Sequence, residues 1–110
     1  MQQHSIKDPI IVIVTVSSED EAKSIGQSLI EKRLAACVNT VSGLKSLFVW
    51  KEKMYNENEI LLLIKSRRDL LHKIITLVKE LHSYDVPEVI ALPIIGGSED
   101  YFKWMEESLI

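Results

Sequence analysis

Three apolar runs, at residues 10–14, 60–64 and 89–95, constrain the fold more than any other feature of the sequence. The length of each run falls within the four to eight residues expected of a strand. Each run is also bounded by polar or turn-forming residues. A strand with one face in water alternates apolar and polar side chains, but neighbouring positions in these runs are all apolar. We therefore expect three strands that bury both of their faces.

Two helices are predicted between these strands. The first follows the strand at residues 9–16, where Ser18 and Glu21 have the spacing of a capping box, and it is expected to run to about Leu34. The second is expected to start at Ser66 as its cap and to present apolar residues at helical spacing between positions 70 and 81. Both helices have one apolar face, which suits packing on a sheet.

The middle of the chain predicts a long antiparallel hairpin. Residues 37–50 are extended in character, with Gly43 as a bulge or bend, and residues 59–65 form the returning strand. The polar stretch at 51–58 is expected to be the turn between them. A closing helix is predicted after Ser98, which can cap it.

The resulting order is βαββαβ followed by a terminal helix, within a single domain over residues 1–110. This order predicts an α+β, ferredoxin-like split βαβ fold with a four-stranded antiparallel sheet and both main helices on one face. Pro93 removes a ladder donor, so the last strand is expected at an edge. Because the helices can cover one face only, the second apolar face predicts a homo-oligomer.

Composition narrows the classes of function. With a net charge of -3, the chain lacks the excess of basic residues that attracts nucleic-acid phosphates, so no nucleic-acid partner is expected. The single cysteine cannot form an internal disulfide, which favours a reducing, cytoplasmic location. The apolar run at 10–16 is too short to span a bilayer, and no membrane association is expected.

Side chains able to do chemistry gather in the connector 82–89, "HSYDVPEV". His82 is the candidate metal ligand, although an imidazole near a helix C-terminus also interacts favourably with the helix dipole. Cys37 is either a nucleophile or a buried structural thiol, and the structural thiol is favoured because no activating base can be identified beside it. Glu88 heads an apolar row of the last strand, and we expect Lys65 to be its partner.

Several motifs together resemble the CutA divalent-cation tolerance proteins. They are "EKRLAACVN", W-x-x-K in the hairpin, E-x-L-x-x-x-K-S, "HSYDVPEVIALPI" and the closing G-x-x-x-Y-x-x-W. The resemblance covers nearly the whole chain in the same order and spacing. It departs from the family pattern at Ser83, where proline is usual, and at Val14, where some members carry a cysteine suited to copper.

This resemblance implies a tight homotrimer, similar in architecture to the PII signalling proteins, with a polar cleft between subunits. Carried over by motif, the ligand-binding residues of the cleft are Cys37, Trp50, Glu59, Lys65, Tyr84 and Glu88. The family name refers to tolerance of copper and other divalent cations. Without a cysteine at Val14, any copper site at His82 is expected to be weak.

Three functions remain open from the sequence. The first is a trimeric cation- or small-ligand-binding protein concerned with metal tolerance. The second is an enzyme that uses the cleft, with Glu59 or Glu88 as base, Lys65 holding an anion and Tyr84 as donor. The third is a trimeric scaffold for partner proteins. We expect a binding protein rather than an enzyme, with no catalytic residues assigned.

Overall fold

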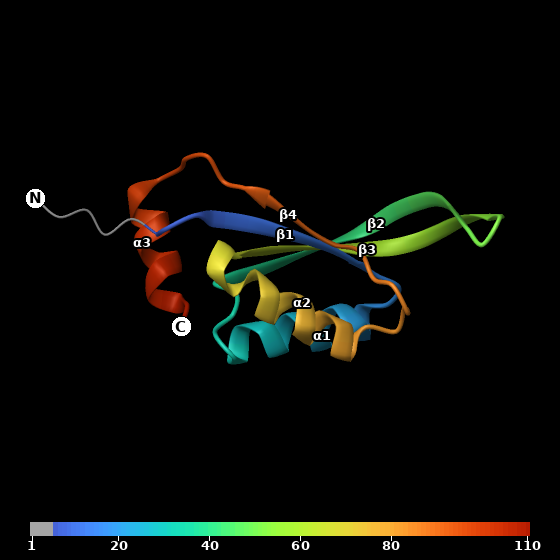
Figure 1. Cartoon of the computed structure of the whole chain (residues 1–110), viewed down its shortest axis with the longest axis horizontal. Helices are drawn as coiled ribbons and strands as arrows, with labels where there is room; N and C mark the ends of the chain where they lie inside the picture. The colour runs from blue at the N-terminus through green and yellow to red at the C-terminus, as the bar shows by residue number, and fades with distance from the viewer. Residues whose placement is uncertain (1–5) are drawn as a thin grey trace, which may run out of the picture.

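The computed structural model of the protein describes residues 6–110 (Figure 1). The elements follow the predicted order, βαββαβ with a terminal helix. They are β1 (Pro9–Val16), α1 (Glu19–Glu31), β2 (Cys37–Trp50), β3 (Lys53–Arg67), a short 3-10 turn η1 (Arg68–Leu70), α2 (Leu71–Leu81), β4 (Val89–Pro93) and α3 (Glu99–Ser108). The α+β class and the ferredoxin-like order are confirmed.

The four strands form one antiparallel sheet in the order β2-β3-β1-β4. The short strand β4 lies at an edge, as its proline predicts. Pro93 is the last residue of β4 and lies opposite Ile10 of β1. A proline is tolerated at the end of an edge strand, because one side of such a strand has no neighbouring strand to bond with.

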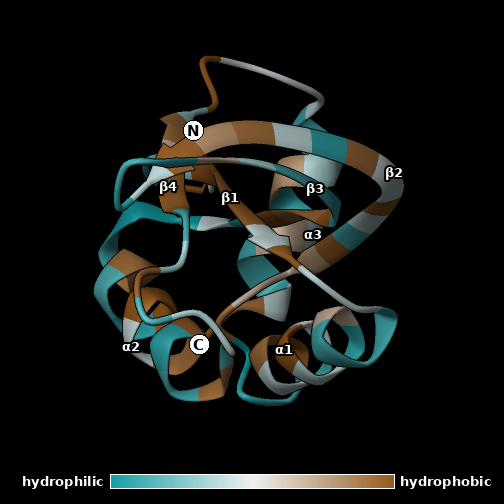
Figure 2. Ribbon diagram, turned by 90° about the vertical axis from the view of Figure 1, so that its right-hand side faces the viewer, coloured by the Kyte–Doolittle hydropathy of each residue, from teal (hydrophilic) through white to brown (hydrophobic). Residues whose placement is uncertain are grey.

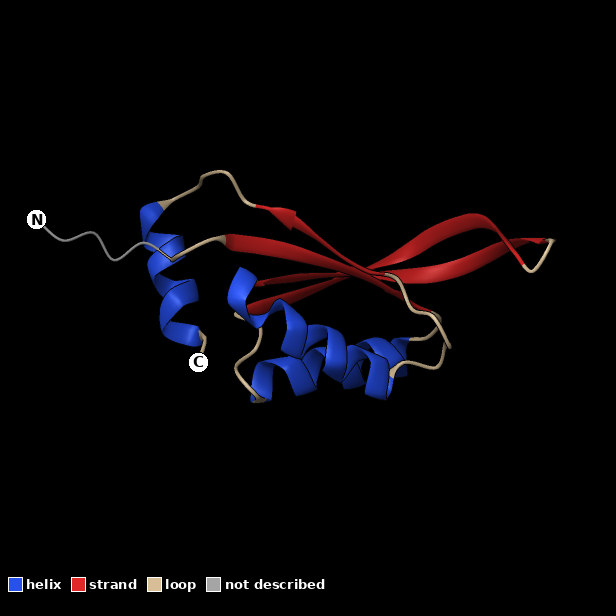
Figure 3. Ribbon diagram, in the orientation of Figure 1, coloured by secondary structure: helices blue, strands red, loops and turns tan. Residues whose placement is uncertain are grey.

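Helices α1 and α2 lie side by side on one face of the sheet, whereas α3 lies at the end of the sheet near the start of β1 (Figures 1 and 3). The main core fills the layer between this helix pair and the sheet. Alternate residues of β1 and β3 point into it and are fully buried, namely Val12, Val14, Leu62 and Ile64. From the helices they meet Ile25, Leu29, Ile74 and Val78, all with no exposed surface.

The opposite face of the sheet, which we call the open face, carries no helix from the described part of the chain. Its central rows are Ile11 beside Leu92, and Ile13 between Leu63 and Ile90. Ile90 is 51% exposed and Leu92 is 50% exposed. Figure 2 shows hydrophobic colour continuing along β1 and β4. The two-sided apolar pattern is therefore real, and one chain covers only one side of it.

The hairpin of β2 and β3 projects well beyond the helices and makes the molecule 57 Å long but only 25 Å wide (Figure 1). Its turn is much shorter than predicted. Only Lys51 and Glu52 leave the ladder, both with positive φ, and β3 already starts at Lys53. The prediction that 51–58 forms the turn was wrong because cross-strand pairing extends through polar residues such as Asn56, opposite Leu47.

Gly43 forms the predicted bulge. Val41 pairs with Leu61, yet the next pair is Leu44 with Glu59, so β2 holds one extra residue there. Gly43 has a φ of 87°, a left-handed conformation that glycine adopts without strain. Because side chains alternate along a strand, this extra residue exchanges the two faces of β2 beyond it.

The predicted cap at Ser66 was wrong. Ser66 is a fully buried residue of β3, and its hydroxyl donates to the Leu34 carbonyl oxygen at 2.6 Å. The chain then turns through η1, whose cap residue Arg67 makes no side-chain capping bond. The helix α1 ends at Glu31, three residues before the predicted Leu34. By contrast, Ser18 and Ser98 cap α1 and α3 as predicted, each accepting a backbone N–H.

The end of α3 is held by a side chain from the α1–β2 connection. Arg33 donates to the carbonyl oxygens of Ser108 at 3.1 Å, Glu107 at 2.9 Å and Leu109 at 3.1 Å. Met105 and Leu109 are buried at this junction, whereas Trp104 of the same helix stays 45% exposed. In the described part of the chain no helix is long and apolar enough to cross a membrane.

Candidate functional site

The segment 82–88 links α2 to β4 and runs beside the base of the hairpin (Figure 1). Glu21 of α1 anchors it. Its carboxylate accepts the backbone N–H of Ser83 at 2.6 Å and the Ser83 hydroxyl at 3.0 Å. The capping-box spacing predicts that Glu21 reaches back to its own helix start. The carboxylate does accept the Ser17 hydroxyl there at 3.4 Å, and it also ties the first helix to this segment. Sequence reasoning missed this role because the two residues are 62 positions apart.

His82 lies under the segment with its side chain fully buried. Its Nε2 donates to the Thr15 carbonyl oxygen at 2.7 Å, so this nitrogen carries the proton. Its Nδ1 accepts the Tyr84 N–H at 3.0 Å and lies 3.3 Å from a Glu21 oxygen. Both ring nitrogens thus have protein partners, and a metal bound by His82 would have to displace one of them.

Tyr84 and Glu59 form the central polar contact of the site. The Tyr84 hydroxyl donates to Glu59 Oε2 at 2.7 Å, and Glu59 is only 6% exposed. Burial, the hydrogen bond to Glu59 and the nearby carboxylate charges raise the pKa of Tyr84 well above its ordinary value. Tyr84 is therefore a neutral donor at any physiological pH.

Four of the predicted ligand-binding residues line one cleft of about 420 Å³. They are Trp50, Glu59, Tyr84 and Glu88. The bulge at Gly43 makes this grouping possible, because it brings Phe48 and Trp50 to the face of the hairpin that Glu59 occupies. We call this grouping the acidic half-site, because Glu59 and Glu88 are its charged members.

The other two predicted residues lie elsewhere. Cys37 and Lys65 are cross-strand neighbours, six residues along β3 from Glu59, which is roughly 20 Å at strand spacing. Lys65 Nζ lies 5.7 Å from the centre of the Tyr101 ring, and the Cys37 thiol is 3.8 Å from Asn39 Oδ1. We call Cys37 and Lys65 the basic half-site.

The expected pairing of Glu88 with Lys65 is therefore not made within one chain. Val89 lies opposite Val14, whereas Lys65 lies opposite Ile11 at the far end of β1. The alternation of side chains along the last strand predicted the face of Glu88, but it carried no information about which end of the sheet Lys65 occupies. Among the described residues no cluster of three or more His, Cys, Asp or Glu side chains could hold a metal ion.

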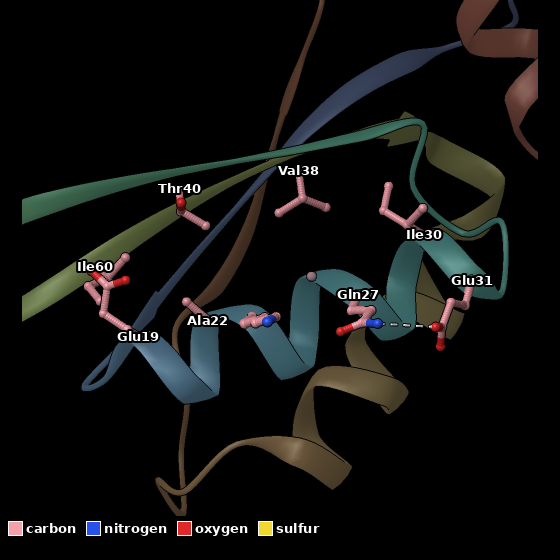
Figure 4. A pocket seen from close by; sticks show the side chains of 10 residues that line it. Glu19, Ala22, Gln27, Ile30, Glu31, Val38, Thr40 and Ile60 are labelled. Atoms are coloured by element: carbon pink, nitrogen blue, oxygen red, sulfur yellow. Dashed lines mark hydrogen bonds between the residues drawn. The ribbon is translucent and has the colours of Figure 1, made fainter.

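Another hollow lies on the other side of the sheet, between α1 and β2, and measures about 630 Å³ (Figure 4). Its floor contains Ala22, Val38 and Ile60, and its rim contains Gln27 and Glu31, which share a 3.4 Å hydrogen bond. None of the predicted ligand-binding residues lines it. It is a groove of the helix layer, separate from both half-sites.

Comparison with known proteins identifies the family of the chain. The family model of the CutA1 divalent ion tolerance protein matches residues 10–108. The divalent-cation tolerance protein CutA of Thermus thermophilus is 44% identical over 98 residues, which are 89% of this chain and 95% of that protein. The chloroplastic protein CutA of Arabidopsis thaliana is 46% identical over 90% of this chain, and the aligned part spans 54% of its own length.

Solved structures give the same result. The crystal structure of CutA1 from Oryza sativa superimposes with a TM-score of 0.92 at 43% identity and covers 96% of each chain. A protein of Archaeoglobus fulgidus described as a periplasmic divalent cation tolerance protein gives 0.88 at 34% identity, with 91% of this chain and 97% of that one covered. The chain therefore belongs to the CutA1 divalent ion tolerance protein family.

Proposed function

We propose that this protein is a trimeric divalent-cation tolerance protein that binds a cation or small ligand in clefts between its subunits. One observation carries the proposal. The open face presents apolar rows that one chain leaves uncovered, with an acidic half-site at one end and a basic half-site at the other. Each exposed large side chain that becomes buried in such an assembly would contribute roughly 1.5 to 3 kcal/mol.

The charges of the half-sites favour a cleft shared between copies. Glu59 is almost buried, and its only partner in the described part of the chain is the neutral Tyr84 hydroxyl. A buried carboxylate without a cation is costly. Lys65 is partly buried and forms no ion pair within residues 6–110. In the proposed trimer, Lys65 of the partner subunit lies beside Glu59 and Glu88, and Cys37 enters the same cleft.

Copper binding is proposed to be weak and to involve His82. Coordination through Nδ1 would break the bond from the Tyr84 N–H, and coordination through Nε2 would break the bond to Thr15. Either loss offsets part of the metal's binding energy. We further propose that the protein acts in the cytoplasm, because its single thiol requires no oxidising compartment.

Calorimetry with copper tests the metal component. Copper should bind with modest affinity that falls as the pH is lowered, because protons compete for the imidazole. His82→Ala should remove most of the binding, while the exposed His72→Ala should leave it unchanged. If wild type and His82→Ala bind copper equally, His82 is not a copper ligand and its imidazole has only the structural role of bonding to Thr15 and Tyr84.

A further inference from the structure

One carboxylate of the helix layer holds the connector 82–88 where it leaves α2. Glu21 lies in the first turn of α1, and only 10% of its side chain is exposed. Its oxygens accept the Ser83 N–H at 2.6 Å and the Ser83 hydroxyl at 3.0 Å. We call these two hydrogen bonds the latch. Because their acceptor is ionised, each is stronger than a hydrogen bond between neutral groups.

The Glu21 carboxylate depends on such donors to stabilise its charge. No lysine or arginine within residues 6–110 forms a salt bridge with it. The Ser17 hydroxyl adds one long hydrogen bond at 3.4 Å, and His82 Nδ1, which lies 3.3 Å away, already accepts the Tyr84 N–H. A nearly buried carboxylate without donors is unfavourable, so breaking the latch destabilises both α1 and the connector.

The backbone of Tyr84 has few other constraints. The connector belongs to no helix or strand, and residues 83–85 form no backbone–backbone hydrogen bond within the described part of the chain. The Tyr84 N–H donates instead to the His82 ring at 3.0 Å. Because Tyr84 directly follows Ser83, the backbone position that the latch gives Ser83 also sets the direction from which the Tyr84 side chain reaches Glu59.

We propose that Glu21 is a positioning residue of the ligand cleft, which acts through Ser83 to hold the Tyr84 hydroxyl against Glu59. Glu21 itself neither lines the cleft nor forms a hydrogen bond with Tyr84 or Glu59. The inference rests on the proposed function, because it takes Tyr84 and Glu59 as ligand-binding residues. It adds that the shape of the cleft is controlled from the helix layer.

The ionisation of Tyr84 reports whether its hydroxyl stays against Glu59. Burial and the hydrogen bond to Glu59 raise the pKa of this phenol, so it ionises late while the contact is intact. NMR of protein with isotope-labelled tyrosine follows the titration, and Tyr84→Phe assigns the signal. In Glu21→Ala the midpoint for Tyr84 should fall by at least about one pH unit, because the connector loses the latch. An unchanged midpoint would overturn the proposal.

Two variants separate the latch from the charge of Glu21. Glu21→Gln removes the charge but keeps an oxygen that can accept the Ser83 N–H, so it should shift the midpoint less than Glu21→Ala does. Glu19→Ala removes an exposed carboxylate of the same turn, which accepts the Ser42 hydroxyl instead, and should leave the Tyr84 titration unchanged. Equal shifts in Glu21→Gln and Glu21→Ala would assign the effect to charge and overturn the latch.

A proline at position 83 tests whether the latch acts through the position of the backbone. His82 has φ -81° and ψ 143°, the extended conformation that a residue before proline adopts. Proline lacks the N–H of the latch but fixes its own φ. Adding Ser83→Pro to Glu21→Ala should therefore return the Tyr84 midpoint toward the wild-type value, and no return in a folded double variant would contradict positioning through the backbone.

If the double variant does not fold, amide hydrogen exchange of Glu21→Ala alone decides the question. The Tyr84 N–H should exchange at least about tenfold faster than in wild type, while the Val12 N–H in β1 keeps its rate. Equal acceleration at both amides would show a general loss of stability and would overturn the proposal.

Sedimentation of the same samples separates this inference from the proposed trimer. An assembled Glu21→Ala trimer with an unchanged Tyr84 titration refutes the latch alone. A monomeric wild type in which removal of the latch still shifts the Tyr84 titration refutes the shared cleft alone.

Discussion

Replacing Tyr84 by phenylalanine removes one hydroxyl from the centre of the site and keeps the ring. The lost contact is a 2.7 Å hydrogen bond to Glu59, a residue that is 6% exposed and has no other partner in the described part of the chain. Hydrogen bonds to charged groups contribute about 1.5 to 3 kcal/mol. We therefore expect the free energy of unfolding to fall by about 2 kcal/mol per chain.

Urea unfolding at one fixed protein concentration measures this change, because the stability of an oligomer depends on concentration. Tyr101→Phe is the matched control. Its ring lies under Lys65, and no hydrogen bond of its hydroxyl is found within residues 6–110, so a change of less than about 0.5 kcal/mol is expected. Equal effects of the two substitutions would refute the assigned strength of the Tyr84–Glu59 contact.

The same hydroxyl predicts a pH dependence in the alkaline range. The pKa of Tyr84 is raised by burial and by Glu59, so above about pH 10 the unfolded chain loses this proton while the folded chain keeps it. The folded state then binds more protons, and stability must fall as the pH rises. Tyr84→Phe should reduce this fall, and absorbance at 295 nm should show one tyrosine that ionises later than the others. Similar slopes for wild type and variant would contradict the argument.

Three further predictions concern the fold and its open face. Ile13→Asp, on the open face, should dissociate the trimer in sedimentation velocity, whereas Ser24→Asp, at an exposed position of α1, should not; an assembled Ile13→Asp protein would exclude this face as the interface. Ser66→Ala should lower the free energy of unfolding, measured in urea, by about 1 to 3 kcal/mol because the buried Leu34 carbonyl loses its donor. The exposed Ser24→Ala should not lower it, and equal effects of the two substitutions would show that the buried hydrogen bond does not stabilise the fold. Deleting Gly43 should turn Trp50 to the opposite face of the hairpin and out of the cleft, so its fluorescence, measured in a Trp104→Phe background, should shift; an unchanged emission maximum would contradict the bulge argument.

Pattern and spacing were sufficient for much of the fold. The apolar run at 10–14 predicted both a strand and a second face that needs cover, and Pro93 predicted the edge. The pattern failed where long-range contacts override local preference. Ser66 has the residue type of a helix cap, but a carbonyl 32 positions away holds it in β3. Asn56 is polar and turn-like, yet pairing with Leu47 makes it part of a strand.

The sequence indicated side chains that share a cleft, but it did not indicate how they are arranged. Motif resemblance selected Trp50, Glu59, Tyr84 and Glu88, and these four residues do line one cleft. The partner of Glu88 could not be predicted, because parity fixes the face of a residue and not its distance along the strand. Glu21 could not be predicted as an anchor of Ser83, because no local pattern links α1 to the connector.

The central claim is that the open face is an interface between copies of this chain. Sedimentation equilibrium at micromolar concentration tests it most directly. Chains of 12.6 kDa should give a single species of about 38 kDa, with no folded monomer detectable. A stable, folded species with the mass of one chain would contradict the interface and, with it, the shared cleft.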